Sequence, residues 1–368
     1  MRMYRSKPEK RSEQRRPKLS ERAQDPWRCE ADVVEGLEAI AADELRRRLG
    51  QDASLQPSPR PGVVPFDYSG PLVALLQLKT IQSVYLVLRF AVPRPRALLG
   101  DQHFRNLLAC IAAVRSLHPP GAFRTLYVSA AGSESAVMTR LKEELARHTG
   151  LEIARDEGDL MLRVRRPFER GEGWEVLVRL SPRPLATRAW RVCNLEGALN
   201  ATVAHAMILL AKPRPQEIVL NPACGSGTLL VERLAASAAG RLIGCDTSPH
   251  ALACARANVS AAGSSDRIEL YPWDARALPL PERSVDVLYS DLPFGQLVGS
   301  HRENIQLYPL ILQEAARVAR QAAPFVVITQ EVRLLETLLA EQQVWALEGV
   351  LRVSLGSAYP RIFILRRR

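Results

Sequence analysis

Asp291, Leu292, Pro293 and Phe294 place a carboxylate, a rigid turn and an aromatic ring side by side in the C-terminal half of the chain. The lone pair of an exocyclic amino nitrogen is conjugated with its ring, so such an amine reacts only when it is well oriented. A carboxylate and a backbone carbonyl can accept its two N–H bonds, while an aromatic ring stacks on the base. Proline restricts the backbone that presents the carbonyl. The four residues therefore suit chemistry at an amino group of a base, although taken alone they also fit a plain turn.

Three features earlier in the chain have the residue types of a cofactor pocket. Asn221 to Thr228 reads Asn-Pro-Ala-Cys-Gly-Ser-Gly-Thr, and its two glycines allow the backbone to approach a ligand closely. Asp246 ends the next predicted strand, where a carboxylate can accept both hydroxyls of a ribose. Asp274 follows the third strand, where it can accept an adenine amino group. Each feature also fits an ordinary turn or helix cap, so the argument depends on their occurrence in series with Asp291.

From Gln216 onward, short apolar segments alternate with helical ones, which is typical of a doubly wound α/β domain. We expect strands at 217–220, 241–245, 267–270, 285–290, 325–329, 344–353 and 358–365, and helices at 228–238, 250–261, 305–320 and 333–341. No helix separates the last two strands, so they should form an antiparallel hairpin at the sheet edge. Ligands of such sheets bind at the carboxyl ends of the strands, where the four features lie.

The N-terminal half contains two small α+β units. Strands at 29–34, 63–68 and 84–91 with helices at 37–49 and 71–78 form the first; helices at 102–117 and 134–148 with strands at 125–130, 160–166 and 174–180 form the second. The last two strands of the second unit are predicted to be a hairpin. Arg163 and Arg165 share one face of the strand at 160–166, because strand side chains alternate. That face is either an RNA-facing edge or a solvated surface.

The formal net charge of +11 is concentrated in the N-terminal half. Residues 1–191 hold 33 Lys and Arg against 23 Asp and Glu, whereas residues 192–368 hold 17 against 16. Nine of these cations fall within the first 22 positions, so residues 1–26 are expected to be a disordered basic arm. A basic excess suits a polyanion such as nucleic acid, and it equally suits a well-solvated surface.

The cysteines, the histidines and the hydropathy limit the compartment and the metal chemistry. The six cysteines are scattered, with no Cys-x-x-Cys pair and no clustering with histidine. This pattern argues against a disulfide framework and a zinc site, and for a reducing cytoplasmic compartment. No apolar run approaches the ~20 residues that span a bilayer, and no signal peptide opens the chain. We therefore expect neither a membrane nor a metal among the partners.

These motifs together resemble those of the class I methyltransferases that modify amino groups, and within them the THUMP-domain guanosine-N2 tRNA methyltransferases. The resemblance covers about 195–368 and depends on Asn221 to Thr228, on Asp291 to Gly295 and on the stretch 299–309. It is looser over 27–191, where the best match is the junction at 178–191. The chain departs from the family pattern at Asn221, where many relatives have Asp, and at Leu292, where many have Pro.

The resemblance implies an α/β fold with a Rossmann-like methyltransferase domain at 213–368. It further implies a ferredoxin-like domain at 27–95, a THUMP RNA-binding domain at 96–183 and a linker at 184–212. S-adenosyl-L-methionine is the implied cofactor, and the implied reaction adds one methyl group to N2 of a guanosine in tRNA, in the acceptor stem and of the position 6 type. A monomer is expected. No metal is expected, because the sulfonium of the cofactor is already activated.

The resemblance also assigns residues. The cofactor-binding set is Asn221, Cys224, Gly225, Gly227, Thr228, Asp246, Thr247, Asp274, Ala275 and Asp291. The catalytic loop consists of Asp291, Pro293 and Phe294. The candidate RNA contacts are Arg163, Arg165, Arg188 and Arg191.

Rival interpretations remain open on the sequence alone. The same catalytic loop serves guanine in ribosomal RNA or adenine in DNA, and an RNA-binding module with an inactive α/β domain is a different class of function. A nicotinamide-dependent oxidoreductase is disfavoured, because Leu230 stands where the third glycine of Gly-x-Gly-x-x-Gly belongs. The number of methyl groups added is not determined by the sequence.

Overall fold

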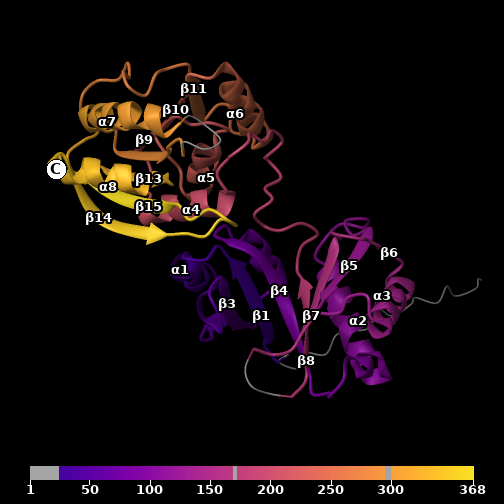
Figure 1. The fold of residues 1–368 in the computed structure, drawn as a ribbon. Coiled ribbons are helices and arrows are strands. Elements are labelled where there is room, and N and C mark those ends of the chain that lie inside the picture. The colour runs from indigo at the N-terminus through magenta and orange to yellow at the C-terminus, as the bar shows by residue number, and fades with distance from the viewer. Residues whose placement is uncertain (1–24, 169–171, 295–299) are drawn as a thin grey trace, which may run out of the picture.

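The computed structural model describes residues 25–168, 172–294 and 300–368. Most of the predicted basic arm, residues 1–24, lies outside the described residues. The described chain forms two sheets, each with its own helices, and Figure 1 shows the N-terminal sheet unit below the C-terminal one.

The N-terminal unit is one mixed sheet of eight strands in the order β2-β3-β1-β4-β8-β7-β5-β6. Its strands are β1 (Trp27–Val33), β2 (Ala53–Leu55), β3 (Val63–Tyr68), β4 (Ile81–Phe90), β5 (Thr125–Ala130), β6 (Glu152–Ile153), β7 (Leu160–Arg165) and β8 (Trp174–Arg179). Its α-helices are α1 (Glu38–Leu49), α2 (Asp101–Arg115) and α3 (Ala136–Thr149). β7 and β8 pair antiparallel, which confirms the predicted hairpin.

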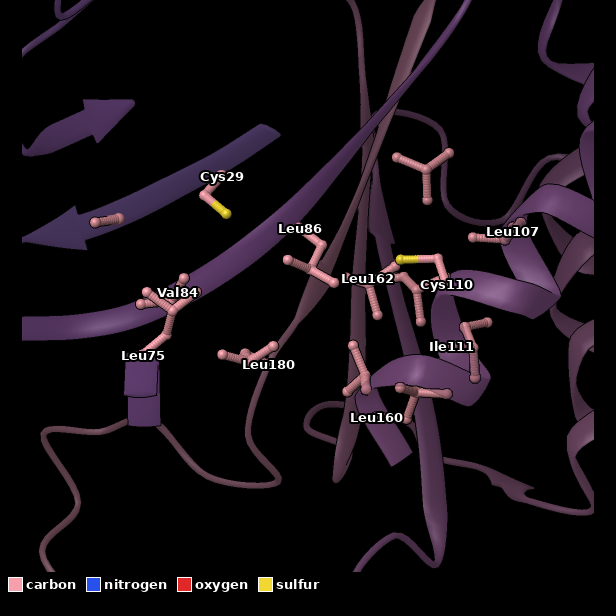
Figure 2. Close-up of a cluster of buried hydrophobic side chains, with 14 of the residues drawn as sticks. Cys29, Leu75, Val84, Leu86, Leu107, Cys110, Ile111, Leu160, Leu162 and Leu180 are labelled. Atoms are coloured by element: carbon pink, nitrogen blue, oxygen red, sulfur yellow. The ribbon is translucent and has the colours of Figure 1, made fainter. Parts of the chain in front are cut away.

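The two predicted N-terminal units share a sheet and a core. β4 pairs antiparallel with β8 over six registered positions, from Tyr85↔Arg179 to Phe90↔Trp174. Figure 2 shows Leu86 of β4 close to Leu162 of β7 and Cys110 of α2, all buried in the same cluster. The proposed division at residue 95 stays a prediction, because a sheet that crosses a boundary does not by itself define domains. The segment at 71–78, predicted as an α-helix, is instead a short 3-10 helix at Leu72–Gln77.

The C-terminal unit is a seven-stranded sheet in the order β11-β10-β9-β12-β13-β15-β14. Its strands are β9 (Ile218–Pro222), β10 (Arg241–Cys245), β11 (Ile268–Tyr271), β12 (Val287–Asp291), β13 (Pro324–Thr329), β14 (Trp345–Arg352) and β15 (Arg361–Arg367). Its helices are α4 (Ala201–Leu210), α5 (Thr228–Ala236), α6 (Pro249–Ala261), α7 (His301–Val318) and α8 (Val332–Ala340). The first five strands are parallel, and β15 pairs antiparallel with β13 and β14. The predicted edge hairpin is therefore confirmed.

Helices cover both faces of this sheet. Val326 and Ile328 of β13 belong to a core cluster that also contains side chains of α4, α5 and α6. Phe325 and Val327 of the same strand belong to a second cluster with side chains of α7 and α8. The alternation follows from the period of two in a strand, and a strand buried on both faces reads as a continuous apolar run. This is the doubly wound architecture that the sequence predicts.

A turn of the N-terminal unit enters the core of the C-terminal unit. Leu37 is fully buried in the cluster that contains α4, and the Ser354 amide donates a hydrogen bond of 3.0 Å to the Glu35 carbonyl. Gly36 has φ +96°, and a Cβ there would lie 2.0 Å from the Arg352 carbonyl oxygen. Only glycine tolerates both conditions, so this turn fixes how the two sheets meet.

Candidate functional site

A cavity of about 540 Å³ lies at the carboxyl ends of β9, β10 and β12. Its volume falls within the range of small-molecule and cofactor pockets. The structure brings most of the predicted cofactor and catalytic residues together around it: Cys224, Gly225, Thr228, Asp246, Thr247, Asp274, Ala275, Asp291, Pro293 and Phe294. Parallel strands deliver these loops to one edge of the sheet, which explains why residues up to 70 positions apart meet.

The loop after β9 turns sharply into α5. Gly227 has φ +77° and precedes the first helical residue, Thr228, and a Cβ on Gly227 would approach the Ala255 Cβ atom to 3.3 Å. Gly227 therefore allows α5 to pack closely against α6, and it lies behind the cavity rather than on its wall. Gly227 is not among the residues that line the cavity, and its contact with the cofactor stays a prediction.

Asn221 also lies behind the cavity wall, and its contact with the cofactor stays a prediction. It is almost fully buried, and its side-chain amide donates hydrogen bonds to the carbonyl oxygens of Tyr289 (2.9 Å) and Pro222 (3.2 Å). The residue thus ties β9 to β12 beneath the pocket. Its neutral amide suits this position, because a carboxylate could not donate to a carbonyl.

Asp246 is fixed by two backbone amides. One oxygen accepts a hydrogen bond from Gly225 N and the other from Ser248 N, both at 2.9 Å. Each carboxylate oxygen has a second lone pair, so Asp246 retains the capacity to accept two ligand hydroxyls. Asp274 is held differently, by an ion pair with Arg276 at 2.6 Å. Its hydrogen bonds with the Arg276 side chain lower the pKa of the Asp274 carboxyl.

Asp291 is the least satisfied carboxylate of the cavity. Its Oδ1 atom is buried and accepts no hydrogen bond from any described residue, while the residue as a whole keeps some exposure toward the cavity. Burial raises the pKa of the Asp291 carboxyl to about 7. A buried acceptor without a partner is rare in folded proteins, so the protein leaves part of the hydrogen-bonding capacity of this carboxyl unused at the cavity wall.

The sequence did not predict two parts of the cavity lining, the segment 195–199 and the aromatic side chain of Trp273. Leu195 to Leu199 line the cavity from the segment before α4. Trp273 lines it too, stacked on Tyr271 with ring centroids 4.0 Å apart and planes within 5°. The Trp-Asp pair after β11 offered a signal for Trp273, whereas the segment 195–199, Leu-Glu-Gly-Ala-Leu, has no local signature of a binding wall.

A disulfide corrects the expectation drawn from cysteine spacing. Cys193 is bonded to Cys254 of α6, with Cα atoms 5.4 Å apart and a sequence separation of 61. Asn258 strengthens the same attachment, since its side chain accepts from the amides of Val192 and Cys193 and donates to the Cys193 carbonyl. The other four cysteines are buried and free. The pairing depends on tertiary proximity, which spacing does not show.

Arg165 already has partners within the N-terminal unit. It forms ion pairs with both Glu30 and Glu175, and its guanidinium also lies over the Phe168 ring at 4.1 Å. Arg163 does share its face of β7, as predicted, and pairs with Asp32 at 2.7 Å. These two guanidiniums form ion pairs with carboxylates of the neighbouring strands β1 and β8. RNA contact by Arg163 and Arg165 therefore stays a prediction, although both guanidiniums are already paired with carboxylates of the N-terminal unit.

Arg188 and Arg191 likewise point inward. Arg188 is buried and pairs with Glu232 of α5 at 2.7 Å, and it donates to the Lys79 carbonyl of the N-terminal unit. It therefore joins the two units. Arg191 donates from Nη2 to the Leu199 carbonyl (2.7 Å) and to the Thr228 hydroxyl (2.9 Å), which places it against the cavity wall. RNA contact by Arg188 and Arg191 stays a prediction, and these internal bonds occupy much of the hydrogen-bonding capacity of both guanidiniums.

Among the described residues there is no group of three or more His, Cys, Asp or Glu residues that could hold a metal ion. No described helix is long and apolar enough to cross a bilayer.

The chain is similar to known methyltransferases in sequence and in structure. The family model for RMKL-like UPF0020 methyltransferase domains matches residues 188–361. A Thermus thermophilus protein named tRNA (guanine(6)-N2)-methyltransferase is 31% identical over 234 residues, which cover 63% of this chain and 67% of the relative. The crystal structure of TrmN from Thermus thermophilus superposes with a TM-score of 0.72 at 26% identity, covering 93% of this chain and 99% of that one.

A mouse protein named tRNA (guanine(6)-N(2))-methyltransferase THUMP3 is 30% identical over 182 residues. The matched stretch covers 46% of this chain and 36% of the mouse protein, so the chain spans about a third of that relative's length. The fold and the cavity, together with the domain match, define a Rossmann-fold methyltransferase that uses S-adenosyl-L-methionine. Within that class the chain belongs to the family of THUMP-containing tRNA guanine-N2 methyltransferases.

Proposed function

We propose that the protein transfers a methyl group from S-adenosyl-L-methionine to N2 of a guanosine in tRNA. The observation that carries the proposal is the Asp291 carboxylate, which has a buried, unpartnered oxygen at the cavity edge beside Pro293 and Phe294. The names of the Thermus and mouse relatives support guanine N2 as the acceptor atom. They also support a position 6 type of target, and we propose that this target lies in the acceptor stem.

The described residues fit the cofactor. The charged residues on the cavity wall are Glu196, Asp246, Asp274 and Asp291, all of them acidic, and the cofactor carries a sulfonium and an ammonium group. We place the ribose hydroxyls at Asp246, the adenine at Asp274 and Ala275, and the methionine portion at Cys224, Gly225 and Thr228. The cofactor supplies an electrophilic methyl group, which needs no metal.

The protein residues orient the amine. Asp291 accepts one N–H bond of the guanine N2 amine, the Leu292 carbonyl accepts the other, and Phe294 stacks on the base. This arrangement turns the nitrogen lone pair toward the methyl group. When the new N–C bond forms and the S–C bond breaks, N2 loses one proton, which passes to the ionised Asp291 carboxylate and from there to solvent. The positive charge of the sulfonium is lost in the same step.

The N-terminal unit is proposed to hold the RNA. We retain a ferredoxin-like domain at 27–95, a THUMP domain at 96–183 and a linker at 184–212 as the working division. The net positive charge of residues 1–191 supports RNA binding there, although Arg165, Arg188 and Arg191 serve internal contacts. We also propose a monomer in the cytoplasm, because the proposed substrate is a cellular RNA.

The test is methyl transfer from labelled S-adenosyl-L-methionine to unmodified tRNA transcripts, followed by nucleoside analysis. A labelled N2-methylguanosine peak that disappears when the guanosine at position 6 becomes adenosine supports substrate and position together. Transfer only to ribosomal RNA would replace the substrate and keep the chemistry. U6 small nuclear RNA is a third arm, because relatives of that named activity are 36–37% identical over 147–148 residues. Cofactor binding without transfer to any of the three would contradict the proposal.

A further inference from the structure

Two side chains of α7 saturate one carbonyl of the catalytic loop. The Pro293 carbonyl oxygen accepts hydrogen bonds from Asn304 Nδ2 at 2.9 Å and from the Tyr308 hydroxyl at 2.7 Å. Both side chains are fully buried. A carbonyl oxygen has two lone pairs, so Pro293 cannot accept a further strong hydrogen bond. The neighbouring Leu292 carbonyl accepts none from any described residue.

The hydrogen bonds behind Tyr308 have one possible direction. The Tyr308 hydroxyl has a single proton, which it donates to Pro293 O, so it must accept from the Thr329 hydroxyl 2.7 Å away. Thr329 in turn accepts a hydrogen bond of 2.9 Å from the Glu331 amide. A directed chain therefore runs from the end of β13 to the catalytic loop. Each donor in such a chain strengthens the next bond, and burial raises the pKa of Tyr308, so the phenol keeps its proton at neutral pH.

Asn304 is oriented just as firmly. Its Nδ2 atom lies 2.9 Å from the Pro293 carbonyl and 3.4 Å from Glu331 Oε1, and both of these atoms are acceptors. Rotating the amide by 180° would place Oδ1 against both of them. The amide can therefore face the loop only as a donor.

We propose that Asn304 and Tyr308 are positioning residues for methyl transfer, which orient the Asp291–Phe294 loop by holding the Pro293 carbonyl. With that carbonyl occupied, the Asp291 carboxylate and the Leu292 carbonyl remain as the acceptor pair for the substrate amine. This inference rests on the proposed function for its chemistry, but the bonds that carry it lie within the protein. It assigns α7 a part in the reaction although neither side chain lines the cavity.

The first test separates orientation from binding. Tyr308→Phe removes one donor, Asn304→Ala removes the other, and the double variant removes both. Tyr289→Phe is the matched control, because it deletes the hydroxyl of another fully buried tyrosine of the same sheet unit that makes no bond to the loop. We expect Tyr308→Phe to lower kcat about tenfold, while the Kd for S-adenosylhomocysteine and the KM for RNA stay within about twofold of the control.

The double variant sharpens the same test, since the two donors share one acceptor. Its loss in kcat should differ from the product of the two single losses, as expected for coupled neighbours. A kcat of Tyr308→Phe and of Asn304→Ala within twofold of the control, in variants that melt at the wild-type temperature, would overturn the proposal.

A second measurement does not depend on the RNA substrate. Amide hydrogen exchange of the 291–294 segment, in the complex with S-adenosylhomocysteine, should be faster in Tyr308→Phe than in the wild type and unchanged in Tyr289→Phe. If the wild type methylates no RNA, the proposed function fails while this exchange still decides the positioning role. Equal exchange in all three proteins would contradict that role whatever the substrate.

Discussion

The charged side chains around β7 have ion-pair partners within the protein, whereas the Asp291 carboxylate of the cavity has an oxygen without one. On β7, Arg165 pairs with Glu30 and Glu175, and Arg89 of β4 also pairs with Glu175, so each of these buried carboxylates has a cation inside the N-terminal unit. At the cavity, Asp291 has a buried oxygen with no donor among the described residues. Both are polar groups removed from water, and only the second retains unused hydrogen-bonding capacity.

The difference separates structural from functional charge. A cation surrounded by its own carboxylates stabilises a fold, because leaving any of these groups unpaired is costly. A carboxylate that the protein leaves without donors is poised for a ligand, and such perturbed groups gather at active sites. Local sequence cannot make this distinction, since Arg163 to Arg165 reads as a basic edge until its partners on other strands are known.

The largest effect should follow from removing the unsatisfied carboxylate. Asp291→Ala deletes the acceptor that orients the amine, so we expect methyl transfer to fall by about 10³-fold, similar to the loss of one oriented group at other active sites. The Kd for S-adenosylhomocysteine should change by less than about threefold, and single-turnover assays with calorimetry measure both.

Asp266→Ala serves as the control for this change, because Asp266 is an exposed aspartate of the same unit without a described partner. Transfer at more than a tenth of the wild-type rate in Asp291→Ala would contradict a role of the Asp291 carboxylate in orienting the amine.

The next largest effect concerns stability. Arg165→Ala leaves Glu30 and part of Glu175 buried without their cation, so the free energy of unfolding should fall by about 3 kcal/mol. Arg147→Ala, which breaks an exposed pair with Glu144 on α3, should leave the free energy of unfolding nearly unchanged. Urea denaturation measures both values. A stable Arg165→Ala protein with a reduced salt slope of RNA binding would instead make Arg165 an RNA contact.

Sequence patterns predicted the parts of the fold that depend on local order. Alternating apolar segments gave the C-terminal sheet and its edge hairpin, and the loops after β9, β10 and β12 gave most of the cavity wall. Long-range pairs were missed or misassigned, because their partners lie far apart in sequence. Arg188 meets Glu232 across 44 residues, and Cys193 meets Cys254 across 61. Asn221 shows the finer limit: its residue type was noticed, but only tertiary contacts reveal that it faces Tyr289 rather than the cavity.

The pH dependence of kcat/KM tests whether the reaction needs the ionised Asp291 carboxylate. The ionised carboxylate accepts the stronger N–H bonds and can take up the proton that N2 loses, whereas the protonated acid cannot take up that proton, and burial raises the pKa of Asp291 to about 7. We therefore expect kcat/KM to fall about tenfold between pH 8 and pH 6, because the ionised fraction falls from about nine-tenths to one-tenth. A profile that stays flat from pH 8 to pH 6 would contradict this assignment.

The same raised pKa predicts a stability effect of opposite direction. The folded state holds a proton on Asp291 that the unfolded state releases between the ordinary pKa, 3.8, and about 7, so this group lowers stability as pH rises through that window. Asp291→Asn should consequently melt at a higher temperature than the wild type above pH 7. The gap should close as the pH falls toward 4, and thermal melts at pH 8 and pH 5 check it.

The smallest effect tests whether the cavity also uses a buried cation. Arg191 has no ion pair with a carboxylate among the described residues, and it donates a hydrogen bond to the Thr228 hydroxyl of the cavity wall. The charged side chains of that wall are all acidic. Arg191 should offset the carboxylate of the cofactor's methionine portion. Arg191→Met is then expected to weaken S-adenosylhomocysteine about fivefold to tenfold, roughly 1 kcal/mol, and to leave 5′-methylthioadenosine, which lacks that carboxylate, unchanged. The exposed Arg267→Met is the control. Equal weakening of both ligands would mean that Arg191 only holds Thr228 in place. The cavity would then offer the cofactor acidic side chains alone, whereas the acidic side chains around β7 are paired with arginines.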